Sequence, residues 1–152
     1  MSVKPIPDGC SGAIPYLSVR NAAKAIEFYR DVLGAVEKFR IEAPSGMIGH
    51  SELMIGDALI FVSEEYPDMG LPAPESIGRT AVSIQIYVKD SDAVVARAEA
   101  AGAKVLRPVA DQFYGDRSGQ FLDPFGHRWN IATRIFDMSP EEMNAKAKQL
   151  FG

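Results

Sequence analysis

The stretch that decides the fold is Asp123-Pro124-Phe125-Gly126-His127-Arg128-Trp129-Asn130-Ile131-Ala132-Thr133-Arg134. Its first four residues predict a tight turn, because proline presets φ at one corner and glycine accepts a positive φ at another. The bulky and β-branched residues that follow favour a strand. Since alternate side chains of a strand share a face, Asn130 and Ala132 point to one side of the sheet and Trp129 to the other.

The chain outside this stretch carries an internal repeat with an offset of 69 residues. A strand, the helix cap Asn21, an apolar helical stripe and Gly34 correspond to a strand, Asp90, a second stripe and Gly102. Each half predicts a strand, a helix and then three strands. Because a helix that buries one face needs a sheet beside it, we predict an α+β fold of two tandem βαβββ modules whose curved sheets form a cleft.

The module boundaries follow from the turn signals. Within a single domain, residues 1–152, we place module one at about 13–63 and module two at about 80–135. Between them, residues 64–79 are rich in proline and glycine, which predicts a linker or mobile loop. Residues 111–119 predict a polar loop, which leaves only 120–122 for the strand before the DPFG turn.

A separate helix is predicted at the C-terminal end, over about 140–151. Ser139-Pro140-Glu141-Glu142 combines an N-cap serine, a proline at the first helical position and a glutamate at the third, which together form a capping box. An apolar stripe follows, so we expect this C-terminal helix to dock on the body or on a partner subunit.

Composition narrows the function classes. Apolar residues make up 47% of the chain, enough for an ordinary core, and a net charge of −4 argues against nucleic-acid binding. The single cysteine, Cys10, excludes an intrachain disulfide and suits a reducing compartment. No apolar run approaches the roughly 18 residues of a membrane span. We therefore expect a cytoplasmic protein that binds neither nucleic acid nor membrane.

The sequence resembles the vicinal oxygen chelate superfamily, which includes glyoxalases, bleomycin-resistance proteins and dioxygenases. The resemblance rests on Ile14-Pro15-Tyr16-Leu17-Ser18-Val19, on Ala25-Ile26-Glu27-Phe28-Tyr29-Arg30-Asp31-Val32-Leu33-Gly34 and on the Asp-Pro-Phe-Gly turn with its strand. The Ile-Pro-Tyr-Leu start and His50-Ser51-Glu52-Leu53 look most like the PhnB-like branch. The resemblance also implies a homodimer, because relatives commonly pair.

Metal-binding members of this superfamily hold one divalent ion in the cleft. The resemblance implies that their four ligand positions fall here on Ile14, Phe61, Ser83 and Asn130. Such an ion favours imidazole or carboxylate donors. Isoleucine and phenylalanine offer none, and serine and neutral asparagine are poor ligands. We therefore expect no metal at the family site and no other cofactor.

The same face instead has the composition of a small-molecule pocket, with aromatic rings and a few directional polar groups. The candidate ligand-binding residues are Tyr16, Phe61, Ser83, Gln85, Tyr87, Tyr114, Arg117 and Asn130. Tyr114 and Arg117 lie in the predicted loop and could close over a ligand. Arg117 could equally be a surface charge paired with Asp116, and the whole set could fill the cleft instead.

His50 and Glu52 form a second candidate site, since residues two apart on a strand share a face. They could act as a base with its orienting carboxylate, as ligands of an off-pattern metal, or as a hydrogen-bonded pair on a solvated surface. Three hypotheses follow: a metal-free small-molecule-binding module, a lyase or isomerase of the glyoxalase type that uses His50 and Glu52, and a scaffold with a filled cleft. Whether the protein is an enzyme stays open.

Overall fold

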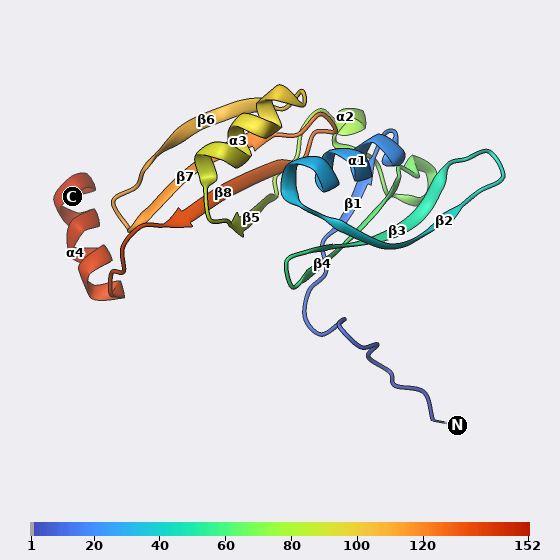
Figure 1. Cartoon of the computed structure of the whole chain (residues 1–152), viewed down its shortest axis with the longest axis horizontal. Coiled ribbons are helices and arrows are strands. Elements are labelled where there is room, and N and C mark those ends of the chain that lie inside the picture. The colour runs from blue at the N-terminus through green and yellow to red at the C-terminus, as the bar shows by residue number, and fades with distance from the viewer. Residues whose placement is uncertain (1) are drawn as a thin grey trace. The chain divides into compact units, whose positions relative to one another are not determined.

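The computed structural model describes residues 2–152 and divides them into two compact units, with the boundary between Arg79 and Thr80. Each unit has a four-stranded mixed sheet with one long helix on one face, as the ribbons in Figure 1 show. This arrangement confirms the predicted α+β fold of two tandem βαβββ modules followed by a C-terminal helix.

The first unit contains β1 (Tyr16–Val19), α1 (Ala22–Leu33), β2 (Val36–Glu42), β3 (Ile48–Ile55), β4 (Ala58–Glu64), a 3₁₀ turn (Pro67–Met69) and α2 (Pro74–Ile77). Its sheet has the order β1-β4-β3-β2, in which β1 is parallel to β4 and the other pairs are antiparallel.

The second unit contains β5 (Ser83–Tyr87), α3 (Ser91–Ala100), β6 (Lys104–Asp111), β7 (Asp116–Leu122), β8 (Arg128–Arg134) and α4 (Pro140–Phe151). Its sheet has the equivalent order β5-β8-β7-β6. None of the helices in residues 2–152 combines the length and the hydropathy that a membrane crossing requires.

The repeat is preserved in strand register. Tyr16 pairs with Phe61 in the first sheet, and Gln85 pairs with Asn130 in the second, at the same offset of 69 residues. The strands that pair next in each sheet, β3 with β4 and β7 with β8, differ in register by one residue. Glu52 lies opposite Phe61 in the first sheet, whereas Gln120 lies opposite the equivalent Asn130 in the second. The two sheets therefore have equivalent β1/β4 and β5/β8 strand pairs, whereas the adjacent strands β3 and β7 differ in register.

Both long helices begin at the predicted caps. Asn21, with φ 68°, accepts a hydrogen bond from the Lys24 amide, and Asp90 accepts one from the Ala93 amide. Gly34 ends α1 with φ 70°, a conformation that glycine adopts without a Cβ clash. The caps satisfy backbone groups that a helix end leaves without intrahelical partners.

The core of each unit lies between its helix and its sheet. In the first unit Val19, Tyr29 and Leu53 are buried completely, and in the second Trp129 and Ile131 are. Alternation along the strands sends the intervening side chains to the opposite face. That opposite face holds most of the candidate site residues, among them Tyr16, Phe61, Gln85 and Asn130.

Asp123 stabilises the Asp-Pro-Phe-Gly turn. Its buried carboxylate accepts hydrogen bonds from the Phe125 and His127 amides at 2.9 Å each, and from the Trp129 indole Nε1 at 2.9 Å. Gly126 turns the chain with φ 92°. One carboxylate thus fixes both the turn and the ring that anchors β8 in the core.

Two segments differ from the sequence-based prediction. Residues 116–119 belong to β7, so the predicted loop over 111–119 was too long. Their polar side chains suit a strand because they have partners, namely Arg134 and Tyr87 for Asp116, Asp92 for Arg117 and Arg107 for Ser118.

The connection over 64–79 holds two short helices. Glu65 fastens it through the Ala73 amide, the Ser76 hydroxyl and Arg20.

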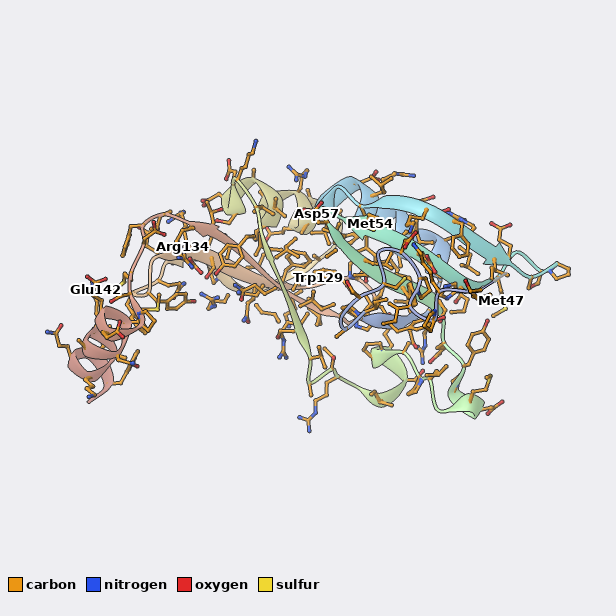
Figure 2. All side chains as sticks on the ribbon, turned by 90° about the horizontal axis from the view of Figure 1, so that it is seen from below. Met47, Met54, Asp57, Trp129, Arg134 and Glu142 are labelled. Carbon is orange, nitrogen blue, oxygen red and sulfur yellow. The ribbon has the colours of Figure 1, made fainter. Side chains whose placement is uncertain are left out.

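The C-terminal helix α4 has the predicted bounds and a complete capping box. Ser139 Oγ accepts from the Glu142 amide at 3.1 Å, and the Ser139 amide donates to Glu142 Oε2 at 2.8 Å. None of its residues is buried, although Met143 and Ala147 are half-buried and the Phe151 ring lies 5.6 Å from that of Phe113. Figure 2 shows Glu142 on the first turn of this helix, beyond the end of β8 where Arg134 is labelled.

Candidate functional site

The open face of the first sheet carries an aromatic cluster formed by Tyr16, His50 and Phe61. Pairing of Tyr16 on β1 with Phe61 on β4 brings their rings to 5.3 Å between centroids in an edge-to-face arrangement. The His50 ring lies 4.8 Å from Phe61 and 5.5 Å from Tyr16. Phe39 on β2 extends the cluster, with its ring 5.9 Å from that of His50. The sequence did not single out Phe39.

A chain of polar contacts runs through this cluster. The Tyr16 hydroxyl lies 2.6 Å from His50 Nδ1, and His50 Nε2 lies 3.5 Å from Glu52 Oε1. A single neutral tautomer of His50 satisfies both contacts, because Nδ1 then accepts from the tyrosine and Nε2 donates to the carboxylate. The structure thus brings together His50 and Glu52, as predicted from their spacing, and adds Tyr16 as the outer member.

Exposure decreases along this chain. Tyr16 is 52% exposed, whereas the side chains of His50 and Glu52 are only 22% and 16% exposed. Tyr16 is therefore the most accessible member of this chain of contacts. The imidazole and carboxylate lie behind it.

A cavity of about 130 Å³ lies on the other side of the first sheet, between α1 and strands β2 and β3. It is lined by Ala23, Ile26, Glu27, Arg30, Ala35, Glu37, Arg40 and Leu53. The Arg40 guanidinium holds the pKa of Glu37 below its ordinary value by hydrogen bonding at this rim. None of the predicted ligand-binding residues lines this cavity.

The open face of the second sheet carries a hydrogen-bonded network centred on Asn130. Asn130 Nδ2 donates to Gln85 Oε1 at 2.7 Å, and Arg107 Nη2 donates to Asn130 Oδ1 at 3.0 Å. Arg107 also donates to Ser118 Oγ at 3.3 Å. Sequence reasoning brought Gln85 and Asn130 together correctly but missed Arg107. The available signal was a single arginine within an otherwise largely apolar strand.

Tyr87 lies further along the same unit, where its hydroxyl donates to Asp116 Oδ2 at 2.7 Å. Arg134 Nε donates to Asp116 Oδ1 at 2.6 Å, and this carboxylate raises the pKa of Arg134. Asp116 is only 2% exposed. Because both of its carboxylate oxygens accept hydrogen bonds, Asp116 connects Tyr87 on β5 with Arg134 at the end of β8.

Arg117, Tyr114 and Ser83 lie apart from the Asn130 network. Arg117 binds Asp92 on α3 at 2.7 and 2.9 Å and Asp111 at 2.9 Å, so it lies on the helix side of the sheet rather than with Gln85. The expected pairing of Arg117 with Asp116 is replaced by these two contacts. The Tyr114 ring lies against Phe113, and Ser83 is exposed opposite Arg128 in the register.

Comparison with known proteins identifies the family of this chain. The model of the Glyoxalase/Bleomycin resistance protein/Dioxygenase superfamily matches residues 13–131. That span includes α1, α3 and both sheets up to the middle of β8, so the chain belongs to this superfamily.

Three similar proteins illustrate the family. An uncharacterized protein of Mycobacterium bovis is 37% identical over 134 residues, covering 86% of this chain and 88% of its own. The crystal structure of TioX from Micromonospora sp. ML1 has a TM-score of 0.63 at 25% identity and covers 85% of this chain and 100% of its own. The fosfomycin resistance protein FosX from Listeria monocytogenes, solved with Mn(II) and sulfate, shares the fold at a TM-score of 0.63 and 20% identity, over 90% of this chain and 97% of its own.

The side chains at the positions where the resemblance implies metal ligands do not fit a divalent ion. Phe61 presents a hydrocarbon ring to Tyr16 and His50, and the Asn130 amide is used by Gln85 and Arg107. A guanidinium beside Asn130 also opposes a cation by its charge. Within residues 2–152, no three histidine, cysteine, aspartate or glutamate side chains gather as a metal would require.

Proposed function

We propose that this member of the superfamily is a metal-free protein that binds a small, planar molecule on the open sheet faces of its modules. The observation that carries the proposal is the edge-to-face packing of Phe61 with Tyr16 and His50, at a position where metal-binding relatives require a donor. An aromatic surface at this position favours stacking over coordination.

The chemistry of the first sheet indicates the class of ligand. Tyr16 and Phe39 are 52% and 46% exposed, which is unusual for rings gathered on one sheet face. Exposed rings bind planar or cationic groups, while the Tyr16 hydroxyl and the Glu52 carboxylate offer hydrogen bonds to the ligand's edge. The net charge of −4 slightly favours a neutral or cationic ligand over an anion.

Thermal denaturation with a panel of planar aromatic compounds, neutral and cationic, tests this proposal. A compound that binds the folded state raises the midpoint in a concentration-dependent way. The shift should fall strongly in Phe61→Ala and persist in the control Phe136→Ala, a ring of the second unit that is 46% exposed. An equal shift in both variants would place the binding elsewhere.

Elemental analysis of protein purified without chelator tests the metal-free part of the proposal separately. We expect zinc, nickel and manganese each to be far below one equivalent. One equivalent of any of them, lost in the double variant His50→Ala with Glu52→Ala, would instead identify an off-pattern metal site and a metal-dependent lyase or isomerase.

A second candidate function rests on the Tyr16–His50–Glu52 chain. A carbonyl ligand with an acidic neighbouring C–H could lose that proton to the Tyr16 oxygen as the tyrosine proton moves to His50 Nδ1. The C–H electron pair then enters the enolate, and Glu52 stabilises the imidazolium. This is proton-transfer chemistry of the isomerase type and uses only residues whose contacts are given above.

Deuterium exchange into hydroxyacetone, followed by NMR in D₂O, tests this second function. Exchange above the buffer rate that is lost in Tyr16→Phe and in Glu52→Gln, but kept in Glu99→Gln on α3, would support an enzyme. Exchange equal to buffer in the unmodified protein argues for binding alone. The stacking proposal does not depend on this outcome.

A further inference from the structure

A single row of polar side chains crosses all four strands of the second sheet. Gln85 on β5 lies opposite Asn130 on β8, and Asn130 lies opposite Gln120 on β7. Gln120 in turn lies opposite Arg107 on β6. Residues that lie directly opposite each other in a sheet share a face, so all four side chains are on the open face, away from the buried Trp129. We call these four residues the polar row.

Arg107 is a half-buried cation without an acidic partner. Its Nη2 donates to Asn130 Oδ1 at 3.0 Å and to Ser118 Oγ at 3.3 Å, and its Nη1 donates to the Ser118 carbonyl at 3.5 Å. All three acceptors are neutral, and no carboxylate of residues 2–152 pairs with this guanidinium. By contrast, the partly exposed Arg40 and Arg117 each pair with carboxylates. Since a cation removed from water is normally paired, the counter-charge of Arg107 is missing from the chain.

Gln120 supplies a second unused donor beside Arg107. Its side chain is half-buried, and within the described part of the chain it forms no hydrogen bond. The Nε–H of Arg107 likewise donates to none of the described residues. Carboxylate oxygens accept several hydrogen bonds at once. One carboxylate can therefore accept from the guanidinium and from the neighbouring amide.

The charge around the polar row is positive, although the chain as a whole carries −4. Arg128 and Lys104 both lie opposite Leu122, in the adjacent row of the same face. The two rows together hold three cationic side chains and no acidic one. Further along this face, the Asp116 carboxylate is already engaged by Arg134. A net charge sums over the whole surface, whereas a ligand responds to the charges near its own site.

We propose that the polar row binds the carboxylate group of a small planar monoanion, with Arg107 as the anchor and Gln120 as the second donor. The inference rests on the proposed function for the planarity of the ligand and adds the ligand's charge. A hydrogen bond between a guanidinium and a carboxylate is charge-assisted, and the planar guanidinium matches a planar two-oxygen group. A cationic group would be repelled by Arg107 and by its neighbours Arg128 and Lys104.

Titration calorimetry with three probes of the same shape tests the charge preference. Benzoate, benzamide and benzamidinium share one ring and have planar head groups that are anionic, neutral and cationic. We expect benzoate to bind at least about tenfold more tightly than benzamide, and benzamidinium to bind most weakly. Phenylphosphonate, which carries a tetrahedral head group on the same ring, should bind no more tightly than benzoate.

Variants of Arg107 locate the preference on the polar row. Arg107→Gln should weaken benzoate binding at least about tenfold and leave benzamide binding within about twofold, because only the anion loses its counter-charge. Arg107→Lys keeps the charge but lacks the planar fork, so it should weaken benzoate binding less. Lys146→Gln, at an exposed position of α4, changes the net charge by the same amount and should leave benzoate binding unchanged. Circular dichroism checks that each variant is folded.

The outcomes separate this inference from the proposed function. Benzoate that does not bind, that binds no more tightly than benzamide, or that binds Arg107→Gln as well as the natural chain overturns the polar row as a carboxylate site. Tighter binding of phenylphosphonate than of benzoate also overturns it. Benzoate binding that is lost in Arg107→Gln but unchanged in Phe61→Ala supports the polar row and contradicts stacking on the first sheet. Benzamide binding that is lost in Phe61→Ala, with benzoate no tighter, sinks only the charge preference.

Discussion

Glu64 and Thr133 hold the same position in the two repeats, and each accepts a hydrogen bond from the first backbone N–H of the helix in its own unit. Glu64 Oε1 receives the Ala22 amide at 2.8 Å, and Thr133 Oγ1 receives the Ser91 amide at 3.0 Å. The side chain at the end of the fourth strand thus caps the helix that follows the first strand. Two different residue types perform this one task.

Removing these caps should destabilise each unit. We expect Glu64→Ala and Thr133→Val each to lower the free energy of unfolding by about 1 kcal/mol, the usual effect of losing a helix N-cap acceptor. Urea denaturation followed by circular dichroism measures the change. Glu99→Ala, at an exposed position of α3, is the control and should change stability by less than about 0.5 kcal/mol. Equal losses in all three variants would deny the capping role.

Asp123 should be among the most sensitive polar residues. Asp123→Ala leaves the Phe125 and His127 amides and the Trp129 indole without their acceptor, and we expect a loss of about 3 kcal/mol, because unsatisfied buried donors are costly. Calorimetry of the variant measures this loss. Asp137→Ala removes a carboxylate that is 98% exposed and should be nearly neutral. A mild effect at Asp123 would mean that water replaces the carboxylate.

Gly115 and Gly46 form a matched pair for a steric prediction. Both have positive φ, 99° and 87°, so alanine is strained at either. At Gly115 a Cβ would also meet the Phe136 backbone carbonyl, whereas at Gly46 it meets nothing within 4 Å. Gly115→Ala should therefore destabilise more than Gly46→Ala and should speed amide exchange at Ile135 and Phe136. Similar exchange in the two variants would contradict the steric argument.

The Glu65 carboxylate gives a pH-dependent prediction. The Ser76 hydroxyl, the Ala73 amide and Arg20 hold the pKa of Glu65 below its ordinary value. A carboxylate whose folded pKa is lowered stabilises the fold above the unfolded pKa, near 4.3, and loses that contribution as the pH falls through the folded pKa. The stability difference between the natural chain and Glu65→Gln should therefore shrink on acidification from neutral pH.

The matched variant for this titration is Glu99→Gln on α3. Its stability difference from the natural chain should stay small at every pH, because Glu99 lies at an exposed position. Urea midpoints measured across the acidic range provide the comparison. A Glu65→Gln difference that stays constant with pH would show that the carboxylate does not titrate with folding.

Local sequence signals predicted most of the fold because they are strong and independent. Asn21, Gly34 and Asp90 mark helix ends by backbone chemistry that needs no tertiary information. The capping box at Ser139 predicted α4 to the residue. The β7 start was missed because Asp116 and Ser118 resemble loop residues until their partners on β8 and β6 are known.

The candidate site was only partly predictable for a related reason. Residues adjacent in a strand pair, such as Tyr16 with Phe61 and Gln85 with Asn130, follow from the repeat and its register. Arg107 joins Asn130 from a strand two positions away, across irregular β6–β7 pairing whose register no periodicity specifies. Arg117 was predicted to close over a ligand because its strand was taken for a loop, which hides the alternation that turns it toward α3.

The burial of Trp129 has a practical consequence for watching this protein unfold. It is the chain's sole tryptophan, and its indole belongs to the second unit, hydrogen-bonded to Asp123. Tryptophan fluorescence therefore reports on the unfolding of the second unit, whereas circular dichroism of the backbone reports on both units. Superimposable melting curves from the two signals would mean that the halves lose structure in concert, and displaced curves would mean that a duplicated chain has kept two separate cooperative transitions.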